Sequence, residues 1–344
     1  MSKRPTIDDV ARLAGVSKST VSAVINGGGA ISEATRARVA GVIEQLNYRP
    51  SSRARHRKTR HNRSIGLLIR ENDNPFYSKV IDGIRAAATP GHYTVLVASS
   101  EGSYEAEREA VKLLQEQGVD GLLLYPVLNQ EADLSHLFEL KRHNFPFILL
   151  ESVWGLQSSL VDIDNTSASR GAVEYLISLG HTRIVHFAGP AYSMHRKERI
   201  EGFYRAFSGS RFVVPEQAIV PTGSHLSDGY RVGLEYFGAM SAAERPTAVT
   251  CYNDMVAMGL CRALSELDLR VPEDVSVVGF DDVAFLDYFR PSLTSVHVPR
   301  FEIGKQAAEI LIRHIESGEI LKPQWVRLDA NLVVRGSTCS PNLS

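Results

Sequence analysis

Near the N-terminus, apolar residues recur at the three- and four-residue spacing of amphipathic helices. In 6–26, TIDDVARLAGVSKSTVSAVIN, they predict two short helices, and SEATRARVAGVIEQLNY predicts a third that begins at Ser32. The inner faces are small or branched apolar residues: Val10, Ala11, Ala14, Val21, Val24, Val39, Val42, Ile43 and Leu46. Three such helices can enclose a small core, although a core of this size is marginal on its own.

The first two helices are separated by a residue that permits a tight turn. Gly15 can adopt the left-handed conformation, while Thr6 and Ser17 are good N-caps for the helices that follow them. These offsets are typical of a helix-turn-helix. The alternative, an αα-hairpin inside a core, does not explain the short polar side chains that face outward: Ser17, Lys18, Ser19, Thr20, Ser22 and Asn26. Such side chains reach phosphates and base edges without filling the groove.

From residue 64 the pattern changes to apolar strands that alternate with amphipathic helices. Strands are predicted at 65–69, 94–98, 121–124, 147–150, 184–188, 219–221, 248–251 and 276–279. Helices are predicted between them, the first three at 80–88, 105–117 and 134–143. This alternation indicates parallel sheets covered by helices on both faces, and about 280 residues are enough for two such units.

The net charge of −1 hides an asymmetry along the chain. Residues 1–63 hold 13 basic against 4 acidic residues, a net +9, and the remainder holds 25 against 35, a net −10. A basic head on an acidic body indicates a polyanion-binding module joined to another function, and the alternative is a solvated basic tail.

Composition narrows the class of protein further. The three cysteines, Cys251, Cys261 and Cys339, lack metal-ligand spacing and cannot all pair, which fits a reducing compartment. No apolar run approaches the ~20 residues that span a bilayer, and MSKRPTIDD has no signal-peptide core. We therefore expect a cytoplasmic protein without a membrane partner, and no cofactor is indicated.

The head motif TIDDVARLAGVSKSTVSAVING, followed by ISEATRARV and LNYRP, resembles the lactose/galactose-repressor family of bacterial transcription regulators. The resemblance implies that the second helix lies in the major groove of operator DNA and that two heads of a homodimer read a pseudo-palindrome. It places Lys18, Ser19 and Ala23 at the principal specificity positions. The implied backbone contacts are Thr6, Ser17, Thr20, Ser22 and Asn26.

The linker RPSSRARHRKTRHNR at 49–63 corresponds to the hinge of that family, where a leucine is commonly wedged into the minor groove. Ala54 matches the family pattern, whereas Arg57 stands in the leucine slot and Arg53 at another commonly apolar position. We hypothesise that this hinge binds through phosphates and through arginine inserted into a narrow minor groove. A disordered basic linker is the alternative.

In the body, the segments NPFYSKVIDGI, GVDGLLL, GHTRIVHFAGP, YNDMVAMGL and LRVPEDVSVVGFDD carry the same resemblance. It implies two doubly wound subdomains of the periplasmic-binding-protein type with an effector cleft between them. The expected boundaries are 1–48 for the head, 49–63 for the hinge and 64–344 for the body. Within the body, 64–163 with 296–322 and 164–293 with 323–338 form the subdomains, with crossings near 161–164, 294–296 and 322–324.

Effectors of open α/β sheets bind beyond the carboxyl ends of the strands. The resemblance assigns a polar clamp to Arg199, Asn253 and Asp281, in which an arginine, an amide and a carboxylate satisfy the adjacent hydroxyls of a sugar. Phe76, Tyr77 and Trp154 are candidates to stack on its apolar face, and His195 is a further candidate contact. The alternatives are that Asp281 caps a segment, Arg199 pairs with a nearby glutamate and Trp154 is core. A neutral sugar or polyol is expected, with a phosphorylated sugar as the alternative, since no run of basic and planar residues specifies a purine.

Two rival classes remain open at this stage. His181, Asp281 and Cys251 would be the residues of an enzyme of carbohydrate metabolism, but no nucleophile elbow or phosphate-binding loop is present. A transport-type sugar-binding protein would share the body but not the DNA-binding head. The expectation is therefore a repressor whose operator affinity depends on an effector. Its C-terminal RGSTCSPNLS has no leucine heptad for tetramer formation.

Overall fold

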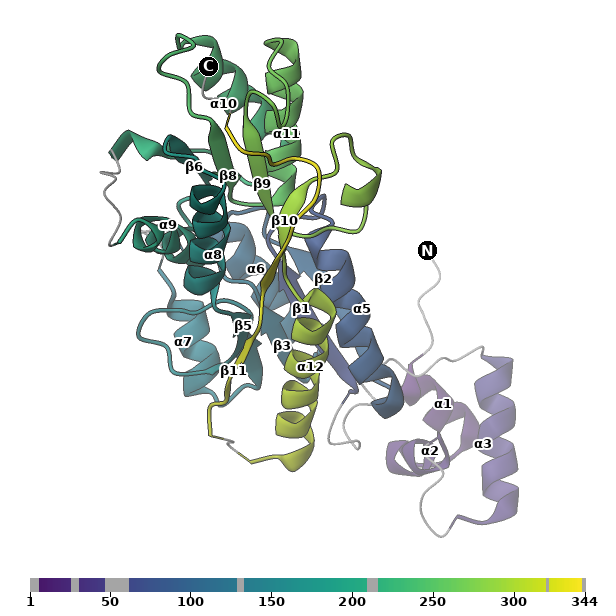
Figure 1. Ribbon diagram of the computed structural model, residues 1–344. Coiled ribbons are helices and arrows are strands. Elements are labelled where there is room, and N and C mark those ends of the chain that lie inside the picture. Colours follow the sequence, from purple (N-terminus) through teal and green to yellow (C-terminus); the bar gives the residue numbers. More distant parts are fainter. Residues whose placement is uncertain are drawn as a thin grey trace. The chain divides into compact units, whose positions relative to one another are not determined.

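The computed structural model describes residues 6–25, 31–46, 62–128, 133–208, 216–319 and 322–341. The chain divides into two compact units, Met1–Asn62, the head, and Arg63–Ser344, the body, and each has its own core. Figure 1 labels their elements. Among the described helices, none combines the length and the apolar character needed to cross a membrane.

The head consists of α1 (Ile7–Ala14), α2 (Lys18–Ile25) and α3 (Glu33–Gln45). Thr6 and Asp9 form a reciprocal capping box at the start of α1, and Gly15 ends that helix with a φ of 62°. Ser32 caps α3. The predicted inner faces are confirmed, since the core is built from Val10, Ala11, Ala14, Val21 and Val39 with Val16, Val24, Val42, Ile43 and Leu46 against them.

The first sheet of the body is entirely parallel, in the order β11-β5-β4-β3-β1-β2. Its strands are β1 (Ser64–Ile69), β2 (Thr94–Ser99), β3 (Gly121–Leu124), β4 (Phe147–Leu149), β5 (Ser159–Ile163) and β11 (Trp325–Leu328). Its helices are α5 (Phe76–Ala88), η1 (Thr89–Gly91), α6 (Tyr104–Glu116), α7 (Ser135–Arg142) and α12 (Arg300–Ser317).

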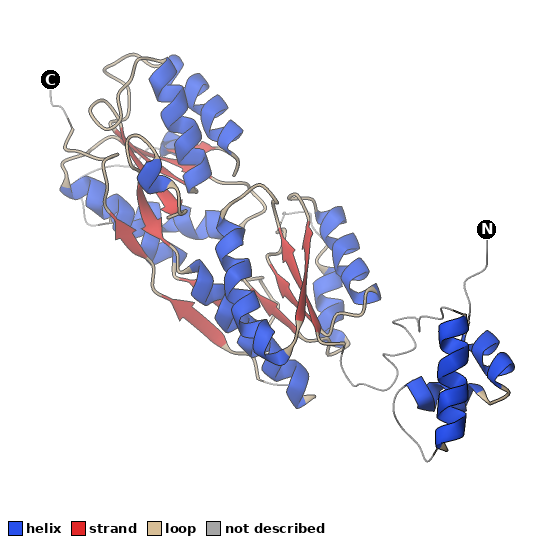
Figure 2. Ribbon diagram, turned by 90° about the vertical axis from the view of Figure 1, so that its right-hand side faces the viewer, coloured by secondary structure: helices blue, strands red, loops and turns tan. Residues whose placement is uncertain are grey.

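Alternate residues of β1 point to two different hydrophobic layers. Ile65 and Leu67 belong to the cluster that contains Val80 of α5 and Leu311 of α12. Leu68 belongs to the cluster formed with α6 and α7. A strand buried on both faces explains why SIGLLI is a continuous apolar run, and Figure 2 shows helices on either side of the sheets.

The second sheet has the order β12-β10-β9-β8-β6-β7, parallel except for the β10–β12 pair. Its strands are β6 (Ile184–Ala188), β7 (Ile219–Pro221), β8 (Ala248–Cys251), β9 (Ser276–Asp281), β10 (Thr294–His297) and β12 (Asn331–Val333). Its helices are α8 (Asn165–Ser178), α9 (Met194–Ala206), η2 (Glu216–Ala218), α10 (Leu226–Gly238), α11 (Asp254–Glu266) and η3 (Leu286–Tyr288). The doubly wound architecture with two sheets is the fold class expected from the sequence.

The chain passes three times between the two sheets, and two crossings differ from expectation. β10 pairs with β9, so the second crossing follows His297 instead of lying at 294–296. β11 pairs with β5 in the first sheet, so the third crossing lies between Leu328 and Asn331, beyond the expected 322–324. The physical reason is that β11 is an edge strand with exposed alternate residues, whose short pattern does not reveal the sheet that it joins.

Candidate DNA-binding and effector sites

The second helix of the head presents a polar surface. Ser17, Lys18 and Ser19 are exposed, while Thr20, Ser22 and Ala23 are partly exposed. The Ser17 hydroxyl accepts a hydrogen bond from the backbone N–H of Thr20 at 3.1 Å and lies 2.6 Å from the Ser19 hydroxyl. Ser17 therefore caps α2 as expected, and its neighbours form a cluster of hydroxyl groups beside the helix N-terminus.

Other predicted DNA contacts have different surroundings. Lys18 Nζ lies 2.5 Å from Asp8 Oδ1 in an exposed ion pair, which costs little to exchange for a phosphate contact. Thr6 is exposed and engaged in the cap of α1. Asn26, Arg53, Ala54 and Arg57 lie outside the described residues, and so does most of the hinge.

Six of the seven predicted effector residues line a single cavity between the two subdomains of the body. The cavity, which we call the cleft, is lined by Arg70, Glu71, Asn74, Phe76, Tyr77, Tyr125, His195, Arg199, Tyr252, Asn253 and Asp281. Trp154 is the exception, because it lies outside the cleft and is 82% exposed. Trp154 occupies the loop between β4 and β5. It therefore neither lines the cleft, as predicted, nor belongs to the core, which was the alternative.

Arg199 lies in the middle of α9, which begins at Met194. Its guanidinium Cζ lies 3.5 Å from the centroid of the Phe280 ring, and Nε donates to Asn165 Oδ1 at 3.0 Å. Nη1 donates to the backbone carbonyl of Tyr252. Arg199 is thus buried and held over an aromatic ring, with no ion pair to Glu198 or Glu201 among the described contacts.

Asn253 combines a structural role with its position in the cleft. Its Oδ1 accepts from the backbone N–H of Val256 at 2.9 Å, which caps α11. Its Nδ2 donates to the backbone carbonyl of Ser224 at 2.9 Å. The cap fixes the direction of the amide and so holds Asn253 at the cleft wall.

Asp281 ends β9 with a φ of 109°, in the region that non-glycine residues avoid. Within the described part of the chain, no group donates a hydrogen bond to its carboxylate. Burial raises the pKa of Asp281, and Arg199 and Arg300 offset part of this rise. Burial also raises the pKa of neighbouring Asp254, and the charge of Asp281 raises it further.

The sequence missed several groups that join the two subdomains across the cleft. Glu71, which follows β1, accepts from the Tyr192 hydroxyl at 3.0 Å and from Ser224 Oγ at 2.5 Å. Buried Glu151, which follows β4, forms an ion pair with Arg70 and accepts from Ser193 Oγ at 3.1 Å. The available signal was the position of these charged residues directly after apolar strands.

The cleft in this conformation is nearly filled by its own side chains. Its volume is about 30 Å³, which is room for about one water molecule. Sites for small ligands measure about 300–1,000 Å³. A ligand therefore requires the two subdomains, or the side chains between them, to move apart.

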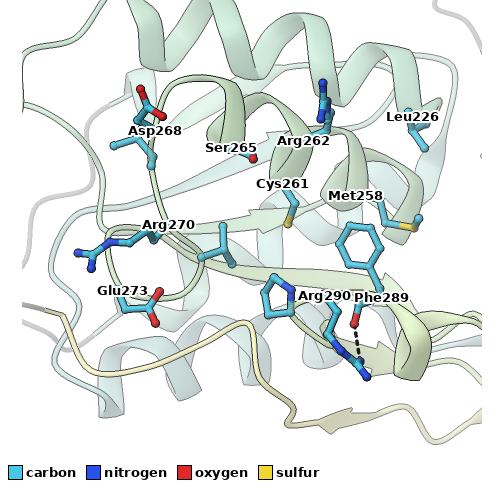
Figure 3. Close-up of a pocket in the computed structure, with 13 residues that line it drawn as sticks. Leu226, Met258, Cys261, Arg262, Ser265, Asp268, Arg270, Glu273, Phe289 and Arg290 are labelled. Atoms are coloured by element: carbon cyan, nitrogen blue, oxygen red, sulfur yellow. Dashed lines mark hydrogen bonds between the residues drawn. The ribbon is translucent and has the colours of Figure 1, made fainter.

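A wider groove of about 740 Å³ lies in the second subdomain, along α11 and the loops at 268–273 and 289–291 (Figure 3). Two of its arginines are engaged by other groups, since Arg270 Nε lies 2.8 Å from Asp274 Oδ2 and Arg290 donates to the backbone carbonyl of Phe289 at 3.0 Å. Burial raises the pKa of the Cys261 thiol beneath it to about 12, so this thiol is not a reactive nucleophile. None of the predicted effector residues lines this groove, whereas six of them line the cleft.

The residues of the rival enzymatic interpretation do not form a catalytic group. Both ring nitrogens of His181 are engaged, Nδ1 with Thr247 Oγ1 and Nε2 with the carbonyl of Cys339, each at 2.9 Å. His181 thus ties the C-terminal segment to Thr247, the residue directly before β8. Burial raises the pKa of Cys251 well above its usual value.

A helix-turn-helix head on a body of two doubly wound subdomains with a polar cleft defines an effector-controlled DNA-binding regulator. The family model "Bacterial regulatory proteins, lacI family" matches residues 6–51, and "Periplasmic binding protein-like domain" matches 173–338. The chain is 38% identical over 333 residues to the HTH-type transcriptional repressor PurR of Vibrio vulnificus, covering 96% of this chain and 97% of the relative.

Solved structures agree with this assignment. The transcriptional regulator CelR in complex with cellobiose has a TM-score of 0.72 at 31% identity, covering 97% of this chain and 100% of that one. The lac repressor dimer bound to operator and the anti-inducer ONPF has a TM-score of 0.74 at 27% identity, covering 98% and 100%. A ribose-bound LacI-family regulator from Enterococcus faecium has 0.69 at 28% identity, covering 80% and 99%.

The chain belongs to the lacI family of bacterial regulatory proteins. It is a DNA-binding transcriptional repressor controlled by a small-molecule effector, and it is not an enzyme. The expectation drawn from the head motif is confirmed, and the enzymatic and transport alternatives are set aside.

Proposed function

We propose that the effector is a neutral sugar or polyol held in the cleft by the clamp of Arg199, Asn253 and Asp281. The observation that carries this proposal is the Asp281 carboxylate, a buried acceptor without a donor in the described part of the chain, beside the fixed guanidinium of Arg199. Adjacent sugar hydroxyls donate to the first and accept from the second. Phe76 and Tyr77, whose rings meet edge to face at 5.3 Å, supply an apolar wall, and His195 completes the lining.

Two of the similar regulators support this chemistry, since cellobiose is bound in one and ribose in the other. Because the cleft has only about 30 Å³ of free volume, the proposed effector enters by breaking the contacts of Glu71 with Tyr192 and Ser224. The effector then controls DNA affinity only through its differential binding to the open and closed bodies.

DNA binding is proposed to involve a homodimer whose two heads occupy two half-sites. Dimer contacts are placed on the body, including helices of the first subdomain, in keeping with the dimeric lac repressor. In each head, Lys18, Ser19 and Ala23 face the bases, while Thr6, Ser17, Thr20, Ser22 and Asn26 fix the helix on the phosphates. Arg53, Ala54 and Arg57 in the hinge are assigned to the minor groove. The domain limits proposed are 1–48, 49–63 and 64–344, with the subdomain crossings corrected as above.

The test is a thermal-shift screen of sugars, polyols and nucleobases against the full-length protein, followed by titration of each hit against operator binding. A sugar or polyol should stabilise the wild type, and Arg199→Ala and Asp281→Asn should each abolish that shift. The matched control is Arg170→Ala, because Arg170 forms only an exposed pair with Glu174 on α8. A nucleobase as the stabilising compound, or a clamp variant that responds like wild type, would overturn the proposal.

A further inference from the structure

Three potential metal ligands meet at the junction of the two subdomains. Asp162 belongs to β5 of the first subdomain, and His195 and Glu198 belong to α9 of the second. One ligating atom from each lies within 4.8 Å of the others. His195 Nε2 is already 2.9 Å from Asp162 Oδ2, so the cluster bridges the subdomains.

Sequence spacing and helix geometry explain why two ligands come from α9. Residues three apart lie on the same face of a helix, so His195 and Glu198 in the segment HRKE both turn toward β5. One imidazole and two carboxylates form a three-ligand set that suits first-row divalent cations and leaves positions for water. In such sites the ligands lie about 2.0–2.2 Å from the ion and hence about 3.4 Å from one another, so a small rotation of Glu198 closes the set.

A second observation concerns the hydrogen bonding of Glu198. Its Oε2 is buried and has no hydrogen-bond partner in the described part of the chain. An unsatisfied buried acceptor destabilises the fold, and a carboxylate oxygen in this position is satisfied by a cation as well as by a donor.

The surroundings of the cluster also favour a cation. Glu151 Oε2 lies 3.7 Å from Nδ1 on the other side of the His195 ring and adds negative charge beside the cluster. In the ion-free protein a proton lies between Nε2 and Asp162 Oδ2, which are 2.9 Å apart, and a bound cation would replace that proton. The nearby cations are held by other groups. Arg70 pairs with Glu151, and Arg199 binds Asn165 and the carbonyl of Tyr252.

We propose that Asp162, His195 and Glu198 bind a first-row divalent cation, with Zn²⁺ as the probe, and that the ion ties the two subdomains together. The proposed cation binding does not depend on the proposed sugar effector. Its consequence for regulation does depend on that proposed function. An ion bridging β5 and α9 opposes separation of the subdomains, so the ion and an effector that widens the cleft weaken each other's binding.

The test is calorimetric titration of ZnCl₂ into the full-length, chelator-treated protein without an affinity tag. Partly exposed Cys339 is changed to Ser in every sample, because its thiol would otherwise bind Zn²⁺. One ion per chain is expected, and Glu198→Gln and Asp162→Asn should each weaken binding at least 30-fold. The matched control is Glu201→Gln on the same helix, whose side chain pairs with exposed Arg205. Mg²⁺ in place of Zn²⁺ should bind far more weakly.

Hydrogen exchange provides a readout that does not depend on the heat of Zn²⁺ binding. Zn²⁺ should slow exchange of the first-turn amides of α9 in the wild type but not in Glu198→Gln. Neither Glu198 nor Asp162 belongs to the proposed effector clamp, so loss of Zn²⁺ binding with an unchanged sugar response supports a separate ion site. Equal Zn²⁺ affinity in the wild type and Glu198→Gln would overturn the ion site while leaving the clamp untouched.

Discussion

The backbone N–H of His195 donates a hydrogen bond to the carboxylate of Glu151 at 3.0 Å. His195 is in the first turn of α9, so a residue of the first subdomain caps a helix of the second. The N-cap Ser193 makes no cap bond of its own and instead donates to Glu151. A helix N-terminus favours negative charge, and Glu151 supplies it across the cleft. The closed body is therefore held together by helix capping as well as by side-chain contacts.

Glu151→Gln should weaken this closure. The amide retains an acceptor for α9 but leaves buried Arg70 without its anion, and breaking a buried ion pair costs about 3–5 kcal/mol. Opening of the cleft rehydrates Arg70 and so offsets part of this cost. The loss of the ion pair should therefore appear as a more open body with a moderately lower Tm. X-ray scattering should show a larger radius of gyration. Glu139→Gln, at an exposed pair with Arg142, is the control and should change stability by less than about 0.5 kcal/mol.

A separate prediction concerns the crossing of α5 and α12. A Cβ at Gly304 would lie 2.1 Å from the backbone carbonyl oxygen of Val80, so the two helices cannot stay in place around an alanine. Gly304→Ala should destabilise the body by about 1–3 kcal/mol in urea denaturation. Gly171→Ala on α8 meets no atom within 4 Å and should be neutral or stabilising by up to about 1 kcal/mol. Equal effects of the two substitutions would contradict this packing argument.

In the head, Gly15→Ala tests the turn between α1 and α2. Nothing lies within 4 Å of the added Cβ, so the cost is conformational and arises from the φ of 62°. A left-handed alanine costs about 1–2 kcal/mol, which should reduce hydrogen-exchange protection of the Val10 and Val21 amides about tenfold. Gly15→Asn should have a smaller effect, because asparagine tolerates this conformation. A loss of protection that is the same for both variants would point to a cause other than backbone strain.

The features predicted correctly from the sequence are those that local spacing or the family motif specifies. The three head helices, eight strands and six cleft residues follow from spacing and from the family motif. Glu71 and Glu151 were missed because their partners Tyr192 and His195 lie 121 and 44 positions away, and no local pattern specifies such pairing. Trp154 was a candidate to stack on the effector, but it lies in a loop that exposes it to solvent, and no periodicity specifies the direction of a loop side chain.

The final prediction concerns the pH dependence of folding and rests on His186 in β6. This side chain is fully buried, Nδ1 lies 3.0 Å from Thr250 Oγ1, and Nε2 has no partner in the described part of the chain. Burial, together with the charge of Arg199, lowers the pKa of His186 from 6.5 to about 3. The folded body therefore excludes the proton that the unfolded chain accepts.

The sign follows from this difference in proton affinity. Because the folded pKa is lower than the unfolded pKa, the contribution of His186 to stability is complete above pH 6.5 and is lost as pH falls toward 3. At about 1.4 kcal/mol per pH unit, acidification from pH 7 to pH 5 should remove about 2 kcal/mol through this residue. Urea denaturation of His186→Gln at both pH values should show a correspondingly smaller loss than the wild type. His143→Gln changes an exposed histidine and should follow the wild type, so an equally steep pH dependence in His186→Gln would show that other buried groups govern acid unfolding.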